Sequence, residues 1–140
     1  MVKLIVGSKG FGKTKILIDL VKKAAEVSKG NVICIERGDA LKFGLSHHIR
    51  LIDIQEYSIS GADGYYGFIA GLLAGDYDIT DIFGDATFKI LCGKDSKDFG
   101  ALAQFVDKID ALTKNGPDVT FTVSCEPADL PESMQKYIVK

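Results

Sequence analysis

The chain has few cysteines and few prolines. Its three cysteines, Cys34, Cys92 and Cys125, are an odd number at wide spacings, which fits neither a disulfide framework nor a zinc site. Three prolines stand against 15 glycines, so the composition favours tight loops between regular elements over a proline-rich linker. There is no apolar signal segment at the start, and no apolar run approaches the roughly 18 residues of a membrane span. We therefore expect a cytoplasmic protein with no membrane association.

The chain also lacks an excess of basic charge. Its 17 lysines and arginines face 19 acidic residues, for a net charge of -2, so we expect no nucleic-acid site. The lysine groups Lys22-Lys23 and Lys89, Lys94, Lys97 are interpreted as solvated surface. A length of 140 residues with 46% hydrophobic residues predicts one globular domain over residues 1–140.

Strand and helix patterns alternate along the chain. Short apolar runs typical of buried strands occur at residues 2–6, 32–35, 49–54, 79–83 and 119–123. Helical patterns occur at 17–25, 63–74 and 102–112, and 137–139 is a candidate for one more strand. The helix at 63–74 is so apolar that we expect it either to pack deeply or to be covered by a partner. The order predicts a three-layer α/β/α sandwich with a mainly parallel sheet.

Residues 7–14 read GSKGFGKT and match the phosphate-loop pattern G-x-x-x-x-G-K-[ST]. The glycines let successive backbone N–H groups approach a phosphate. Lys13 would supply a positive charge to the β- and γ-phosphates, and the Thr14 hydroxyl would ligate Mg²⁺. The motif lies between an apolar strand and an amphipathic helix, as this chemistry requires. The predicted nucleotide-binding residues are Gly7, Ser8, Lys9, Gly10, Phe11, Gly12, Lys13, Thr14 and Lys15.

Through this motif the chain resembles the P-loop NTPase superfamily, specifically over residues 2–14 and in element order over most of its length. Within the superfamily it is most similar to small stand-alone bacterial ATPases of the RecA/PilT-like type. The resemblance implies binding of ATP or GTP with Mg²⁺. The chain has no Asn-Lys-x-Asp motif, which favours ATP. The glycine spacing G-x-x-G-x-G is not the dinucleotide fingerprint, which argues against NAD.

A hydrolase also needs a carboxylate near the metal ion. Asp85, which follows the run 79–84, is the candidate Walker B residue that ligates Mg²⁺ together with Thr14. Asp81 inside the run is its rival, and both also fit ordinary loop carboxylates. The resemblance to additional-strand ATPases implies a glutamate directly after the aspartate, but Ala86 stands there.

Two further residues are candidates for catalysis. The resemblance to RecA-like enzymes implies a catalytic glutamate at the end of the second core strand, which is Glu36; the alternative is a surface carboxylate that pairs with Arg37. Ser124 ends the last strand and is a sensor-like candidate. Arg37 and Arg50 are the only arginines in the chain, too few for the lid of a mononucleotide kinase. Either one would serve as an arginine finger only across a subunit interface.

The leading hypothesis is an ATP-binding module with slow or partner-activated, Mg²⁺-dependent ATPase activity, in which Lys13 and Glu36 are catalytic. The alternative is a nucleotide-dependent interaction module without turnover, which displays residues 65–73 to a protein partner or a second copy of itself. A small phosphotransferase ranks third, because the sequence offers no acceptor pocket or lid.

Overall fold

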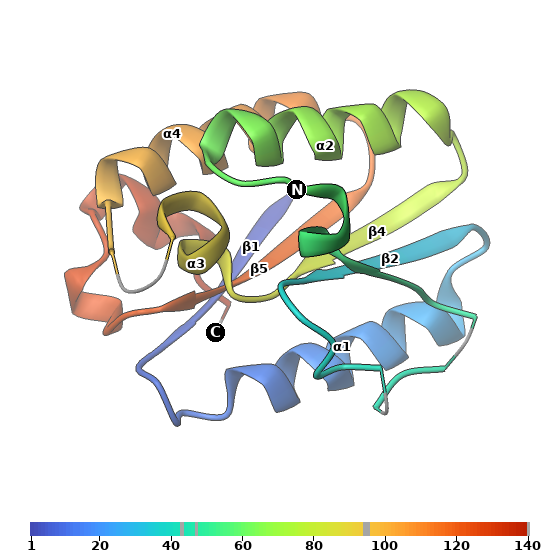
Figure 1. Cartoon of the computed structure of the whole chain (residues 1–140), viewed down its shortest axis with the longest axis horizontal. Coiled ribbons are helices and arrows are strands. Elements are labelled where there is room, and N and C mark those ends of the chain that lie inside the picture. The colour runs from blue at the N-terminus through green and yellow to red at the C-terminus, as the bar shows by residue number, and fades with distance from the viewer. Residues whose placement is uncertain (43, 47, 94–95, 140) are drawn as a thin grey trace.

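The chain folds around one parallel β-sheet (Figure 1). The computed structural model describes residues 1–42, 44–46, 48–93 and 96–139. All strand pairs are parallel, in the order β1-β5-β4-β2-β3. The predicted α/β class with a parallel sheet is therefore confirmed. The strands are β1 (Val2–Gly7), β2 (Asn31–Glu36), β3 (Arg50–Asp53), β4 (Ile79–Gly84) and β5 (Asp118–Ser124).

Helices lie on both faces of the sheet. Figure 1 shows α1 on one face, with α2 and α4 side by side on the other and α3 beside them near the sheet edge. Among the described residues, no helix combines the length and the apolar character that a membrane crossing requires. The helices are α1 (Lys13–Val27), α2 (Ala62–Gly75), α3 (Thr87–Cys92) and α4 (Phe99–Leu112), and short 3-10 helices cover Ile54–Tyr57, Pro127–Asp129 and Glu132–Tyr137.

Successive strand residues point to opposite faces, which gives the protein two hydrophobic cores. In β1, Leu4 belongs to the larger core under α2 and α4, and Ile5 belongs to the smaller core under α1. On α2, Tyr65 and Ile69 are completely buried, and the Tyr65 ring stacks on Phe105 with centroids 5.0 Å apart. Only these two of the 14 residues of α2 are buried, so one face of the helix packs into the core, and a partner that covers the rest stays a prediction.

Two parts of the chain differ from the sequence-based expectation. Helix α3 was not predicted, because its six residues are too few to show a helical stripe, yet four of them are buried. The strand predicted at 137–139 was wrong. A 3-10 helix occupies Glu132–Tyr137, and Ile138 forms only an isolated parallel bridge to Leu4.

Candidate functional site

The loop between β1 and α1 has three glycines, of which the motif fixes Gly7 and Gly12. Gly10 and Gly12 have φ angles of 91° and 88°, in the left-handed region that glycine adopts without strain. At Gly7, a Cβ would lie 2.5 Å from Cδ1 of Phe11, so the exposed Phe11 side chain would have to shift. The turn is closed by the Phe11 N–H, which donates to the Ser8 carbonyl at 3.0 Å. The left-handed conformations thus account for glycine at positions 10 and 12.

Lys13 is the first residue of α1 and is half-buried. Its Nζ donates to the Ser8 carbonyl oxygen at 3.0 Å, which places the positive charge over the backbone of the loop. Burial lowers the pKa of Lys13, and the nearby Asp85 carboxylate partly offsets this by favouring the charged form. Lys13 of the loop and Asp85 are thus close enough to interact electrostatically.

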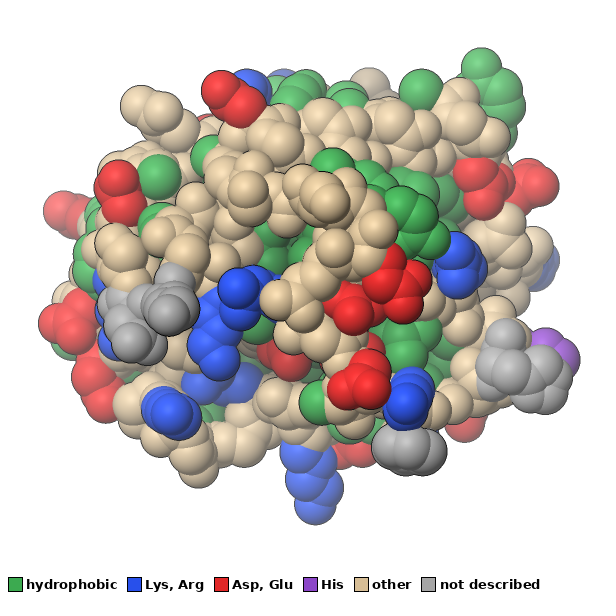
Figure 2. All heavy atoms as spheres, in the orientation of Figure 1, with side chains coloured by type: hydrophobic (Ala, Val, Ile, Leu, Met, Phe, Trp, Pro, Cys, Tyr) green, Lys and Arg blue, Asp and Glu red, His purple; other side chains and the backbone are tan. Residues whose placement is uncertain are grey.

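A cavity of about 760 Å³ lies between this loop and the α3–α4 region. Its floor comes from the carboxyl ends of β4 and β5, where ligands of parallel sheets commonly bind. Lys and Arg side chains gather left of centre on the face shown in Figure 2, where the surface is hollowed. The described lining residues are Lys9, Gly10, Gly12, Lys13, Thr14, Asp85, Ala86, Phe88, Lys89, Ser96, Lys97, Thr122 and Ser124. Five of the predicted binding residues therefore line one cavity together with Asp85 and Ser124.

Asp85 is held by the neighbouring strand β5. Its Oδ1 accepts a hydrogen bond from Thr122 Oγ1 at 2.5 Å, and the same hydroxyl accepts one from the Ala86 N–H at 3.1 Å. Thr122 is 2% exposed, so this arrangement is fixed from inside the sheet. Ala86 has a φ of 54°, an uncommon conformation for a residue with a Cβ. Thr122 thus fixes both the Asp85 carboxylate and the strained turn that follows it.

The rival carboxylate Asp81 lies within β4, as the third of its six residues. It pairs in register with Val32 and Asp118, and its Oδ2 accepts a hydrogen bond from Thr80 Oγ1 at 2.7 Å. Four residues separate it from Asp85, or about 13 Å along an extended strand. Geometry therefore favours Asp85 as the carboxylate of the cavity.

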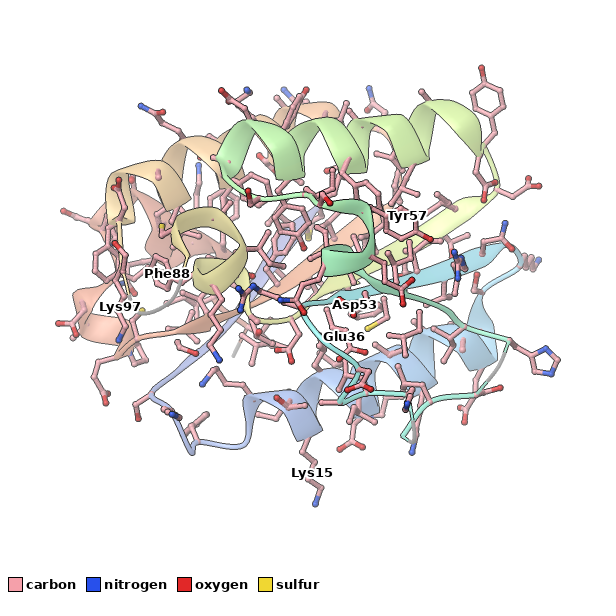
Figure 3. The ribbon with its side chains drawn as sticks, in the orientation of Figure 1. Lys15, Glu36, Asp53, Tyr57, Phe88 and Lys97 are labelled. Atoms are coloured by element: carbon pink, nitrogen blue, oxygen red, sulfur yellow. The ribbon has the colours of Figure 1, made fainter. Side chains whose placement is uncertain are left out.

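Glu36 is the last residue of β2, the strand beside β4, but it is not among the described lining residues of the cavity. It is 3% exposed, and its Oε1 accepts a hydrogen bond from the Leu41 N–H at 3.2 Å. Its Oε2 has no partner among the described residues. Burial raises the pKa of Glu36, and the nearby Asp53 and Asp85 carboxylates raise it further; Figure 3 shows Glu36 next to Asp53.

Other predicted residues lie away from the cavity. The alternative of Glu36 as a surface carboxylate paired with Arg37 was wrong, because Glu36 is buried and bonded to backbone. Lys15 extends from α1 into solvent (Figure 3). Gly7, Ser8 and Phe11 shape the loop without lining the cavity. Phe11 is 61% exposed.

The sequence analysis missed Thr122, Lys89 and Lys97 as site residues. The two lysines were interpreted as solvated surface, but they line the cavity; Lys94 of the same group lies outside the described residues. Lys22 and Lys23 are exposed on α1, as expected. The available signal was Lys89 itself, a charged residue within the otherwise apolar run 86–92.

The donor groups of the cavity fit Mg²⁺ only together with phosphate oxygens. Thr14 offers a hydroxyl, and Asp85 has Oδ2 available while Oδ1 is bonded to Thr122. No group of three or more metal-binding side chains occurs in the described parts of the chain. Mg²⁺ commonly binds through one or two protein oxygens plus substrate phosphates, and this donor set suits that mode.

The charge of the cavity indicates an anionic ligand. Four lysines and one carboxylate are found among its described lining residues, although the whole chain has a net charge of -2. A concave site with such a local excess of ammonium groups attracts polyanions. Comparison with protein-family models and with curated proteins gave no match to this chain.

Proposed function

We propose that this chain is an ATP-binding protein of the P-loop type with slow or partner-activated, Mg²⁺-dependent ATPase activity. The observation that carries the proposal is the cavity in which Lys13 and Thr14 of the loop face Asp85 at the end of β4. The corresponding fold would be the three-layer P-loop sandwich, with β5 between the loop strand β1 and the Asp85 strand β4.

The loop is suited to bind phosphate groups. Its left-handed glycines carry no side chains that would cover the backbone on the ligand side. The amino terminus of the 15-residue helix α1 adds a partial positive charge. Lys13 would bring its ammonium group to the β- and γ-phosphates. These contacts provide affinity without base specificity, and the preference for ATP rests on the missing guanine-recognition motif.

Thr14 and Asp85 are the residues proposed to hold Mg²⁺ with the nucleotide. The ion would neutralise phosphate charge and polarise the terminal phosphoryl group. Thr122 keeps one Asp85 oxygen in a fixed direction through its hydrogen bond. A fixed carboxylate loses less conformational entropy on binding than a mobile one.

Glu36 remains the proposed base for a water molecule. A raised pKa brings a carboxylate closer to the operating pH, which favours general-base catalysis, and Oε2 has no competing partner among the described residues. However, Glu36 lies outside the described cavity lining. This position agrees with the proposed slow or partner-dependent turnover.

The same position favours a second candidate, a nucleotide-dependent interaction module without turnover. Such a module needs the phosphate loop but no base in contact with the ligand. Its display surface would differ from the one first expected, because Tyr65 and Ile69 of α2 are buried in the protein.

Titration calorimetry with ATP, GTP and ADP in the presence of Mg²⁺ tests the proposal. Lys13→Ala should abolish binding, whereas Lys23→Ala, an exposed position on the same helix, should bind as wild type does. Failure of the folded wild type to bind any nucleotide would refute the proposal. Phosphate release then separates the two candidates: with an ATPase, Glu36→Gln lowers turnover and retains affinity, and with an interaction module, the wild type shows no turnover.

A further inference from the structure

A second set of positive charges lies opposite the phosphate loop. Lys89 of α3 and Lys97, just before α4, line the same cavity as Lys9 and Lys13 of the loop. Figure 3 shows Lys97 on the same side of the molecule as Phe88 of α3. The cavity therefore has lysines on two walls, which come from segments far apart in the sequence.

The wall that carries these two lysines is held by packing and capping. The ring of Phe88 contacts Phe99 edge to face, with centroids 5.4 Å apart, which ties α3 to the first turn of α4. Asp98 caps α4 by accepting a hydrogen bond from the Ala101 N–H at 3.0 Å. Because Lys89 and Lys97 adjoin these fixed residues, their backbone positions are set before any ligand binds.

The lysines on the two walls act on each other electrostatically. Lys97 disfavours the charged form of Lys13, a contribution that adds to burial in lowering the pKa of Lys13. Like charges gathered around one cavity repel each other, and a polyanion between them relieves this repulsion. A ligand with more negative charge cancels more of the repulsion between the lysines.

The arginines do not supply this charge. Of the described residues that line the cavity, none is an arginine. Arg50 begins β3 at the opposite edge of the sheet, where its guanidinium donates to the Leu51 carbonyl and the Tyr57 hydroxyl. The cations that line the cavity in the described parts of the chain are therefore lysines.

We infer that Lys89 and Lys97 contact the terminal phosphate of a nucleoside triphosphate and make the site select triphosphates over diphosphates. The inference rests on the proposed function, since it places a nucleotide on the loop. A diphosphate bound there lacks the group that carries the additional negative charge, and the two lysines stay hydrated. The terminal phosphate is thus bound by positive charges from the same chain, with no arginine finger from a partner.

The test compares ATP and ADP affinity by titration calorimetry with Mg²⁺, for wild type, Lys89→Gln and Lys97→Gln. Glutamine removes the charge at similar length, and both side chains are exposed, so folding is expected to be retained. Lys29→Gln is the matched control, because Lys29 is exposed beyond the end of α1, away from the loop. Inorganic tripolyphosphate serves as a probe without a base.

We expect each cavity variant to weaken ATP binding about five- to tenfold and to change ADP binding less than about twofold. Lys29→Gln should leave both affinities as in wild type. Equal losses for ATP and ADP, or no loss for either, would overturn the inference while nucleotide binding by wild type upholds the proposed function. If folded wild type binds neither nucleotides nor tripolyphosphate, both are overturned.

Discussion

Replacement of Thr122 by valine tests whether β5 holds the site together. Valine matches threonine in shape but removes the hydroxyl that donates to Asp85 Oδ1 and accepts from the Ala86 N–H. A hydrogen bond to a charged group contributes about 1.5–3 kcal/mol, and a neutral one about 0.5–1.5 kcal/mol. Asp85 and Ala86 are half-buried, so hydrogen bonds to water in the cavity replace part of the lost free energy. We expect the free energy of unfolding to fall by about 2 kcal/mol.

Urea denaturation measures this loss. With a slope near 2 kcal/mol per molar urea, the midpoint should fall by about 1 M, and the slope should not change. Thr120→Val is the matched control: Thr120 is 5% exposed on the same face of β5, and no hydrogen bond of its hydroxyl is recorded in the described structure. Equal stability of the two variants would refute the role of Thr122. Loss of a fixed Asp85 should also reduce the gain in nucleotide affinity that Mg²⁺ provides.

Three further substitutions test the surroundings of the site. Ala86→Gly should stabilise the protein by about 0.5–1 kcal/mol, because glycine adopts the φ of 54° without strain; a lower urea midpoint would contradict this. Gly84→Ala should destabilise it by about 1–3 kcal/mol in thermal or urea unfolding, since the new Cβ would collide with the Tyr65 hydroxyl and the Phe121 ring. Burial raises the pKa of Glu36 above its ordinary 4.5, so the folded chain keeps this proton to higher pH than the unfolded chain, and wild-type stability falls as pH rises through that interval. Glu36→Gln should therefore gain stability relative to wild type as the pH rises above 4.5, and a pH-independent difference would contradict the shift.

Elements with a strong local pattern were predicted from the sequence. The apolar run at 32–35 became β2, and the stripe at 102–112 became α4, with Asp98 as the cap at its amino terminus. Such patterns reflect the burial of one face or both faces of an element, which neighbouring residues in the sequence encode directly. Helix α3 was not predicted, because its six residues make less than two turns.

The sequence also predicted that residues of the loop 7–14 and Asp85 come together, and they line one cavity, since each was recognised from residues at short spacing. The roles of Thr122 and Lys97 depend instead on which strands are neighbours. Thr122 is an ordinary strand residue by pattern, and only the insertion of β5 beside β4 brings it to Asp85. Strand order is a property of the whole chain, so local spacing does not reveal it.

The position of β5 also bears on how the protein is made. This strand pairs with β1 and β4, yet it is the last of the five strands to leave the ribosome. Until it inserts, β1 has no strand neighbour among the described residues, and Asp85 lacks its bond to Thr122. Contacts between residues so distant in sequence form late and slow the folding of a chain. A nascent chain that ends before Asp118 would thus carry all of residues 7–14 without the neighbouring strand that holds β1 in the sheet.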